Sequence, residues 1–175
     1  MNQLETFRDI KTFIFDVDGV MTNSELIVFE DGKLLRKMSI RDGFALKMAI
    51  NAGYRVAVIT GGKSEGVKNR LAALGIQDIY TNAQDKLEAY EDYIYTFELD
   101  ENKILYMGDD VPDYPVMRRV GFPTCPKDAA VEIIQLSQYI SPYEGGAGCV
   151  RDVIEKVLKL NGEWPIKSGY EDEEE

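Results

Sequence analysis

The chain has 175 residues, of which 45% are hydrophobic and 29% charged, and this composition suits one globular domain with a full apolar core. Its formal net charge of −11 argues against binding to nucleic acid, and the absence of histidine excludes a histidine base and most zinc sites. The apolar runs are too short for a membrane span, and no signal peptide is visible at the N-terminus. Because the two cysteines fit a reduced protein, we expect a cytoplasmic location.

Strand and helix patterns alternate along the chain, which is typical of an α/β fold with a doubly wound parallel sheet. We expect strands over 12–17, 54–59, 78–81, 103–107, 121–125 and 138–140. We expect helices over 42–52, 64–74, 85–97, 112–120, 128–136 and 149–160. Residues 1–162 should form the one domain, and residues 163–175 should form a flexible, acidic C-terminal tail.

An insertion after the first strand interrupts this alternation. Two apolar-rich stretches, 25–30 and 33–38, flank Asp31-Gly32, a dipeptide typical of a β-hairpin turn. Because the insertion follows the first strand, we expect the hairpin to project over that edge of the sheet as a flap. A hairpin that only covers part of the core is the alternative.

Two carboxylates, Asp16 and Asp18, come directly after the first strand. Open α/β sheets bind ligands at the carboxyl edge where this strand ends. Two acids one residue apart can hold a divalent cation and still leave an oxygen free to attack or to transfer a proton. The pair therefore predicts a reactive site at this edge.

Three further groups of polar residues follow other strands or begin a helix. Thr60-Gly61-Gly62 follows the second strand, Lys86 begins the helix after the third, and Gly108-Asp109-Asp110 follows the fourth, with Asp113 beyond it. Parallel topology brings all of them to the edge that carries the acidic pair. Together they offer carboxylates for Mg²⁺, and a hydroxyl, an ammonium and backbone amides for a phosphate group. Each group alone is more often a turn, a helix cap or a surface charge.

With these motifs the chain resembles the haloacid dehalogenase-like phosphatase superfamily over about residues 13–158. The motifs are Phe15-Asp16-Val17-Asp18-Gly19-Val20, Ile59-Thr60-Gly61, Lys86, and Gly108-Asp109-Asp110-Val111-Pro112-Asp113. The resemblance implies that Asp16 is the nucleophile that becomes an aspartyl phosphate. It implies that Asp18 is the general acid and then the general base, while Thr60 and Lys86 hold the phosphoryl oxygens.

The same resemblance implies Mg²⁺ as the cofactor. Its ligands would be Asp16, the backbone carbonyl of Asp18, and Asp109. Asp110 and Asp113 would stand behind these ligands.

The intervals between the motifs leave no room for a cap domain, so we expect a neighbouring subunit to exclude water from the site. This capless pattern, the hairpin, Ile40-Arg41-Asp42-Gly43 and a glycine-rich segment at 145–151 are similar to the 3-deoxy-D-manno-octulosonate 8-phosphate phosphatases. Those enzymes are tetramers of lipopolysaccharide sugar synthesis. The resemblance implies a homotetramer in which the glycine-rich segment covers a neighbour's site; a flexible loop before the last helix is the alternative.

The substrate implied is a small phosphosugar acid, and the residues around the second motif bear on its identity. After Thr60-Gly61 the octulosonate enzymes usually carry arginine and their nine-carbon relatives glutamate, whereas this chain has Gly62-Lys63. Arg70 matches a residue that both groups use for the carboxylate, and a guanidinium fork suits that geometry, although a surface arginine is the alternative reading. The missing glutamate favours the eight-carbon substrate. The expected substrate-binding residues are Gly61, Gly62, Lys63 and Arg70.

Two other functions stay open at this point. One is a phosphatase of a nine-carbon ulosonate 9-phosphate, derived from KDN or sialic acid. The other is a non-enzymatic, receiver-like module that keeps a phosphate on an aspartate. Rapid turnover of a phosphosugar would favour an enzyme, and retention of phosphate for minutes would favour the receiver.

Overall fold

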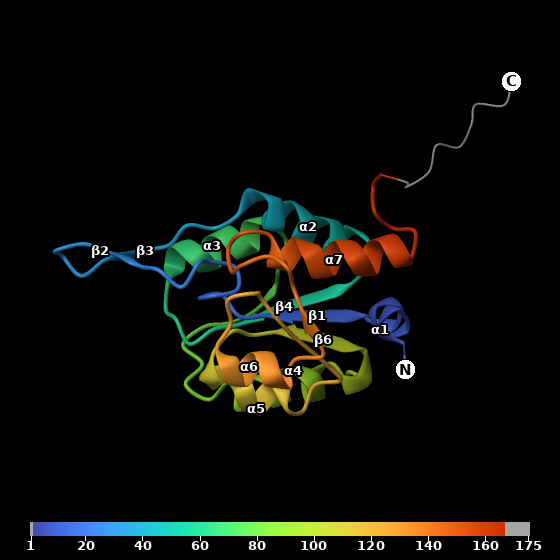
Figure 1. Cartoon of the computed structure of the whole chain (residues 1–175). Coiled ribbons are helices and arrows are strands. Elements are labelled where there is room, and N and C mark those ends of the chain that lie inside the picture. The colour runs from blue at the N-terminus through green and yellow to red at the C-terminus, as the bar shows by residue number, and fades with distance from the viewer. Residues whose placement is uncertain (1, 167–175) are drawn as a thin grey trace, which may run out of the picture.

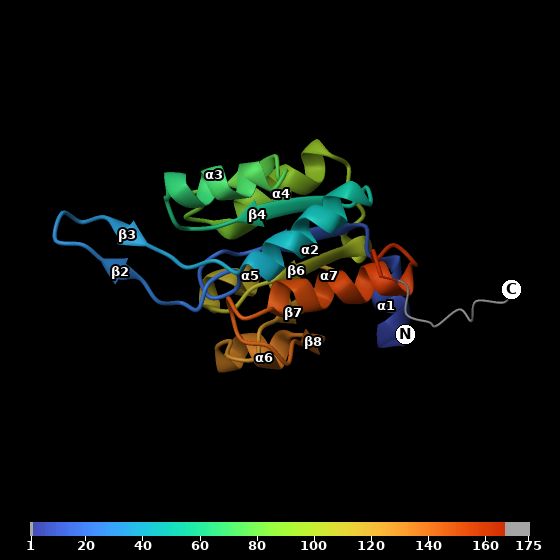
Figure 2. The same ribbon diagram turned by 90° about the horizontal axis from the view of Figure 1, so that it is seen from above.

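A computed structural model describes residues 2–166, in which a parallel sheet lies between two layers of helices (Figures 1 and 2). The strands of the sheet are β1 (Thr12–Phe15), β4 (Arg55–Ile59), β5 (Asp78–Tyr80), β6 (Ile104–Met107), β7 (Phe122–Cys125) and β8 (Tyr139–Ile140). The α-helices are α1 (Gln3–Asp9), α2 (Ile40–Asn51), α3 (Glu65–Ala73), α4 (Lys86–Thr96), α5 (Tyr114–Met117), α6 (Val131–Leu136) and α7 (Cys149–Leu160). Each of these helices is too short or too polar to cross a lipid bilayer.

The strand order β5-β4-β1-β6-β7-β8 fixes where a ligand can bind. From β1 the chain builds the sheet outward on one side through β4 and β5, and then returns to build the other side from β6. The two directions part between β1 and β6, which pair in parallel with Phe15 opposite Met107. Crevices at the carboxyl ends of strands beside such a switch point are the usual ligand sites of open α/β sheets.

Each face of the sheet buries its own core, which explains the continuous apolar sequence of β1. Phe13 and Phe15 point into the core beneath α2, α3 and α7, whereas Ile14 points into the core beneath α4, α5 and α6. All four residues of β1 are buried, as expected for a central strand covered on both sides. The predicted doubly wound sheet and its strands are therefore confirmed, with ends that differ by one or two residues.

Two helical segments differ from expectation. The predicted helix over 112–120 is a 3₁₀ turn, η2 (Val111–Asp113), followed by the single-turn helix α5. Pro115 has no amide hydrogen to donate back to Val111, so one continuous helix cannot form here. Helix α1 was not expected, although Asn2 and Glu5 form the capping box that signals a helix start.

The folded domain extends slightly past the expected boundary at residue 162. Trp164 is buried and packs edge-on against Phe44, with ring centroids 5.9 Å apart. Glu163 accepts a hydrogen bond of 2.6 Å from the Tyr54 hydroxyl. Residues 163 and 164 therefore belong to the domain, while the acidic run at 171–175 lies outside the described residues.

The hairpin is present but does not cover the edge of the sheet. Strands β2 (Ile27–Val28) and β3 (Leu34–Leu35) pair antiparallel and extend away from the domain (Figure 2). The turn is one residue longer than the predicted Asp-Gly pair, because the Phe29 N–H donates to the Lys33 carbonyl and Gly32 takes a positive φ of 83°. The predicted flap is thus confirmed as a hairpin but wrong in its placement.

Asp42, in the first turn of α2, joins this helix to the N-terminus of α7. Gly148 at the N-cap of α7 has no side chain, and Asp42 Oδ1 instead accepts the Arg151 N–H at 2.9 Å. Asp42 Oδ2 is buried without a hydrogen-bond partner in the described part of the chain. Burial raises the pKa of Asp42 to about 6, although the Arg151 N–H and charge oppose the shift.

We expect Asp42→Asn to remove a pH-dependent loss of stability. With a pKa of about 6 when folded and about 3.9 when unfolded, Asp42 binds more protons in the folded state between these values. Its contribution to the free energy of unfolding therefore falls as pH rises through this window and stays low above it. Relative to Asp42→Asn, the wild type should lose about 2–3 kcal/mol between pH 4 and pH 7 in urea unfolding. A difference that stays constant over this range would contradict the assignment.

Candidate active site

Nine of the eleven expected site residues meet in one cavity of about 450 Å³ at the carboxyl edge of the sheet. The cavity lies at the switch point, where the loops after β1 and β6 leave adjacent strands. The predicted residues that line it are Asp16, Asp18, Thr60, Gly61, Gly62, Lys86, Asp109, Asp110 and Asp113. The predicted convergence of the four motifs is therefore present.

Asp16 is a buried carboxylate held by a donor on each oxygen. Oδ1 accepts the Val17 N–H at 2.7 Å, and Oδ2 lies 2.7 Å from Lys86 Nζ. Burial and the nearby charge of Asp113 raise the pKa of Asp16, and Lys86 opposes that shift. These contacts fix the carboxylate at the carboxyl end of β1, where it lines the cavity.

Lys86, at the start of α4, bridges Asp16 to Asp113. Its ammonium lies 2.8 Å from Asp113 Oδ1, and only 6% of the side chain is exposed. Burial alone would lower the pKa of Lys86, but the charges of the two carboxylates outweigh burial and raise it. Lys86 therefore stays charged and offsets part of the negative charge in the site.

Asp113 acts as an anchor beneath the site, because both of its oxygens are fully occupied. Oδ1 accepts the Tyr106 hydroxyl at 2.6 Å in addition to Lys86, and Oδ2 accepts the N–H groups of Asp109 and Asp110 at 2.9 and 3.3 Å. The Tyr106 contact was not anticipated, because a tyrosine within an apolar strand reads as core. The four donors hold the loop after β6 in place.

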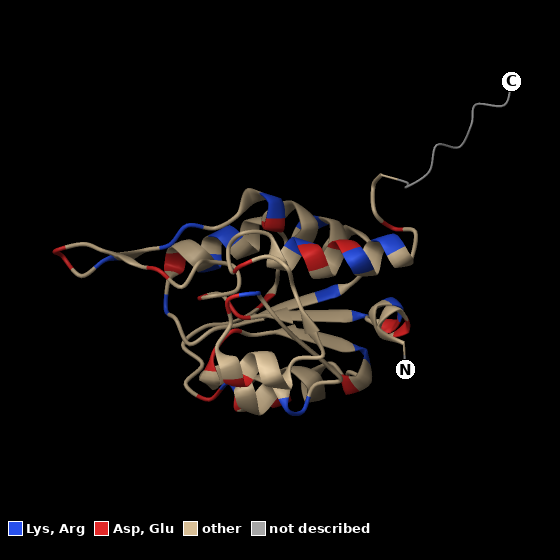
Figure 3. Cartoon of the chain, viewed as in Figure 1, with Lys and Arg blue, Asp and Glu red and all other residues tan. Residues whose placement is uncertain are grey.

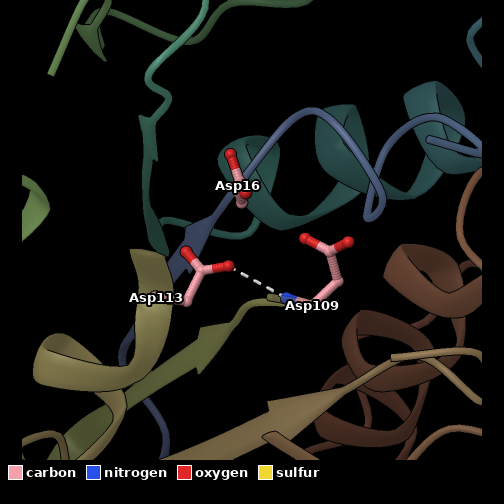
Figure 4. Close-up of side chains that lie close together, drawn as sticks. All are labelled: Asp16, Asp109 and Asp113. Atoms are coloured by element: carbon pink, nitrogen blue, oxygen red, sulfur yellow. Dashed lines mark hydrogen bonds between the residues drawn. The ribbon is translucent and has the colours of Figure 1, made fainter. Parts of the chain in front are cut away.

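Three carboxylates gather at a distance that suits a cation. One oxygen from each of Asp16, Asp109 and Asp113 lies within 4.8 Å of the others (Figure 4). The Asp109 carboxylate has no hydrogen-bond donor among residues 2–166, and burial together with the charge of Asp113 raises its pKa to about 7. Hard oxygen ligands of this kind fit Mg²⁺. Since Asp113 is already saturated, Asp16 and Asp109 are the better placed ligands, with Asp113 behind them.

Asp110 lies at the rim, where it is exposed and caps η2 by accepting the Val111 N–H at 2.8 Å. Its backbone N–H donates to Asp113 Oδ2, and in the same capping box its carboxylate accepts the Asp113 N–H. The predicted place of Asp110 behind the metal ligands therefore remains a prediction, and its observed contacts are those of a helix cap.

Asp18 is paired with a residue that was not predicted. Arg36, just after β3 at the base of the hairpin, holds Asp18 with Nε 2.6 Å from Oδ1 and Nη2 3.3 Å from Oδ2. The Arg36 side chain is only 7% exposed, whereas that of Asp18 is 39% exposed. In the sequence, Arg36 resembles an ordinary surface charge of a hairpin arm, so nothing local marks its partner.

The loop after β4 offers polar groups to an anion. Thr60 is buried, and its Oγ1 accepts the Gly62 N–H at 3.1 Å. The Gly61 N–H has no acceptor within the described range. A hydroxyl and an unpaired amide beside Lys86 match what a phosphate group requires.

The other two predicted substrate residues, Lys63 and Arg70, line a second groove of about 700 Å³ between the hairpin and α3. Lys33 and Arg36 also line this groove, and Figure 3 shows basic residues on both of these elements. The Arg70 guanidinium lies against α2 at Gly43, where a Cβ atom would come within 2.7 Å of Nη2. The expected substrate residues thus fall into two adjoining spaces.

The glycine-rich segment packs against the loop after β1 of its own chain. A Cβ atom at Gly145 would lie 2.0 Å from the Gly19 carbonyl oxygen, and the Gly146 N–H donates to the Val20 carbonyl at 2.9 Å. Only glycine permits this approach of two backbones. The loose-loop alternative is therefore wrong, because the segment supports the loop that carries Asp18; its predicted role as a cover for a neighbour's site stays a prediction.

No protein-family model matches the sequence, but relatives and solved structures do. The 3-deoxy-D-manno-octulosonate 8-phosphate phosphatase of Escherichia coli K12 is 34% identical over 154 residues, which cover 88% of this chain and 82% of that protein. A crystal structure of the enzyme of that name from Yersinia pestis has a TM-score of 0.88 and 31% identity, and the match covers 91% of this chain and 86% of that one. The Moraxella catarrhalis enzyme, in complex with magnesium, phosphate and KDO, has a TM-score of 0.86 and 31% identity, with 90% of each chain covered.

We expect Gly19→Ala to weaken metal binding without unfolding the domain. Gly19 has a φ of +87°, and an added Cβ would lie 1.8 Å from Asp109 Oδ2, so the carboxylate must move. The dissociation constant for Mg²⁺, measured by isothermal titration calorimetry, should rise at least about tenfold.

Gly32→Ala is the matched control, because Gly32 has a φ of +83° but nothing within 4 Å of the added Cβ. It introduces a similar backbone strain far from the carboxylates and should leave Mg²⁺ affinity unchanged. Equal affinities of the two variants would speak against Asp109 as a ligand.

Proposed function

Because this chain belongs to the 3-deoxy-D-manno-octulosonate 8-phosphate phosphatase family of haloacid dehalogenase-like hydrolases, we propose that it removes the phosphate of 3-deoxy-D-manno-octulosonate 8-phosphate (KDO 8-phosphate). The reaction releases the sugar acid and inorganic phosphate, with Mg²⁺ as cofactor. The observation that carries the proposal is the cavity at the switch point, which is lined by the buried Asp16 carboxylate, by the Lys86 ammonium that contacts it, and by Gly61. The setting is the synthesis of a lipopolysaccharide sugar.

In the first step, an oxygen of the Asp16 carboxylate attacks phosphorus and the bond from phosphorus to the sugar oxygen breaks. Asp18 donates a proton to the departing oxygen, so the sugar leaves as an alcohol. Thr60 and Lys86 hold the phosphoryl oxygens during the attack. When bound, Mg²⁺ neutralises negative charge that the carboxylates share with the phosphoryl group.

In the second step, water attacks the phosphorus of the aspartyl phosphate. Asp18 takes a proton from that water, and the bond between phosphorus and Asp16 breaks to regenerate the carboxylate. Phosphoryl transfer depends mainly on placement and charge stabilisation. The fixed positions of Asp16 and Lys86, each only 7% or less exposed, suit that requirement.

The basic groove beside the cavity supports a substrate that carries a second negative charge. Lys63 and Arg70 lie within this groove, next to the loop that carries Gly61 and Gly62. A phosphate in the cavity would leave the rest of a sugar acid able to reach these cations. The absence of a side chain at Gly62 widens the passage between the two spaces.

We also propose that the protein forms a homo-oligomer, a tetramer, through contacts made by the hairpin. Six large apolar side chains on it are 42–69% exposed, namely Leu26, Ile27, Val28, Phe29, Leu34 and Leu35. A two-stranded sheet with open edges and such side chains is marginally stable alone and tends to pair with another chain. A neighbour seated there would also border the cavity, because Arg36 at the base of the hairpin contacts Asp18. A cytoplasmic location is proposed because both cysteines are free and buried.

We expect the wild-type protein with Mg²⁺ to release phosphate faster from KDO 8-phosphate than from KDN 9-phosphate. We also expect Asp16→Asn to lower the turnover of KDO 8-phosphate at least about 10⁴-fold. The amide of asparagine is a poor nucleophile, and it cannot form the aspartyl phosphate. Steady-state phosphate release measures both effects, and circular dichroism checks the fold.

Asp9→Asn, at an exposed position on α1, is the control and should retain wild-type turnover. Comparable turnover by Asp16→Asn and Asp9→Asn would rule out Asp16 as the nucleophile. Phosphate that stays on the wild-type protein for minutes without turnover would favour the receiver-like module.

We expect Val28→Asp to break the oligomer. Val28 is 69% exposed on β2, and a carboxylate there cannot be buried against an apolar neighbour without a large desolvation penalty. Light scattering after size-exclusion chromatography should show a smaller species for this variant than for the wild type.

Val131→Asp makes the same change at a residue that is 64% exposed on α6, and it should leave the oligomer intact. If Val28→Asp and the wild type have the same molar mass, the hairpin is not the contact.

A further inference from the structure

We propose that Arg36 selects the substrate by exchanging partners: its guanidinium holds Asp18 in the free protein and binds the carboxylate of the sugar acid when the substrate arrives. This inference rests on the proposed phosphatase function. It adds a residue, Arg36, that releases the general acid Asp18 only when the substrate carries a carboxylate. The ligand chemistry is a carboxylate at the far end of a phosphomonoester.

The first support is the geometry of the pair. Nε and Nη2 of Arg36 face the two oxygens of Asp18 at 2.6 and 3.3 Å, which is the fork arrangement that guanidinium groups form with carboxylates. While both oxygens are held in this way, the Asp18 carboxyl cannot turn toward the leaving oxygen of a bound phosphomonoester. The fork therefore has to open during each catalytic cycle.

The second support is the location of Arg36 between the two spaces. Arg36 lines a small pocket of about 10 Å³ together with Asp18, Thr60 and Gly62 of the cavity, and it also lines the groove that holds Lys63 and Arg70. At Gly62 a Cβ atom would lie 3.3 Å from Arg36 Nη2 and 3.2 Å from Asp18 Oδ2. The glycine thus leaves just enough room for the guanidinium to sit between cavity and groove.

The third support is the unequal exposure of the two partners. The Arg36 side chain is 7% exposed and has Asp18 as its carboxylate partner, so losing this partner would leave a buried cation unpaired. A substrate carboxylate has the same charge and shape as the Asp18 side chain, and it can replace Asp18 without that penalty. Asp18 is 39% exposed and can be solvated, or can move toward the reacting group, once it is released.

A phosphomonoester without a carboxylate cannot make this exchange. Its single anionic group occupies the site at Asp16, and nothing draws Arg36 away from Asp18. Such a substrate should therefore react slowly with the wild-type protein, and removal of Arg36 should relieve that restraint. Opposite effects on the two kinds of substrate distinguish this role from a merely structural one.

The test compares Arg36→Gln with the wild type on KDO 8-phosphate and on p-nitrophenyl phosphate, both with Mg²⁺. For the sugar acid, kcat/KM should fall at least about tenfold, mainly through KM, because a charge-assisted contact is lost. For p-nitrophenyl phosphate, kcat/KM should rise, because Asp18 is no longer held by Arg36. Arg36→Lys keeps the positive charge but not the two-pronged guanidinium. Its kcat/KM for KDO 8-phosphate should lie between the values of Arg36→Gln and the wild type.

Lys37→Gln is the matched control, because it removes one positive charge from the adjacent exposed residue outside the groove. It should behave as wild type on both substrates, and light scattering should show that all variants keep the same oligomeric state. Equal losses by Arg36→Gln on both substrates would overturn the partner exchange while leaving the phosphatase function intact. Failure of the wild type to hydrolyse either substrate would instead overturn the proposed function.

Discussion

A buried ammonium between two carboxylates is the interaction on which the site depends. Lys86 lies 2.7 Å from Asp16 and 2.8 Å from Asp113, and all three side chains are largely shielded from water. Removal of Lys86 would leave two buried carboxylates without their shared cation, which is strongly destabilising in a protein interior. The same contacts join the loop after β1 and the 3₁₀ turn η2 to the start of α4. They therefore fix both the position of Asp16 and the conformation of these loops.

Glycines at three positions let the backbone come close to this charged centre. Gly19 leaves room for the Asp109 carboxylate, Gly108 leaves room for Asp113, and Gly145 lets the segment before α7 touch the loop after β1. In each case a Cβ atom would come within 2.4 Å of another atom. The acidic cluster is therefore compact because the glycines around it lack side chains. Lys86 offsets part of its negative charge, and Arg36 offsets the charge of the nearby Asp18.

Residues that follow a strand could be assigned to the site from the sequence, and residues that act across the fold could not. Asp16, Thr60 and Asp109 were placed correctly, because parallel strands carry whatever follows them to one edge. Arg36 was missed because its contact with Asp18 depends on the direction in which the hairpin leaves the sheet. No local sequence pattern predicts that direction. The glycine run at 145–148 was recognised as unusual, but a run of small residues does not state which backbone it approaches.

The placement of Gly146 and Cys149 against Val20 has a consequence for how the protein matures during synthesis. The Cys149 thiol donates to the Val20 carbonyl across 129 residues, and the Gly146 amide donates to the same oxygen. A ribosome therefore finishes the acidic loop early but must translate 129 further residues before the loop gains its contact with Cys149. Contacts between such distant segments form late and slow the folding reaction. Nascent chains that stall before α7 should emerge with a sheet that is partly assembled and a catalytic loop that still lacks its final shape.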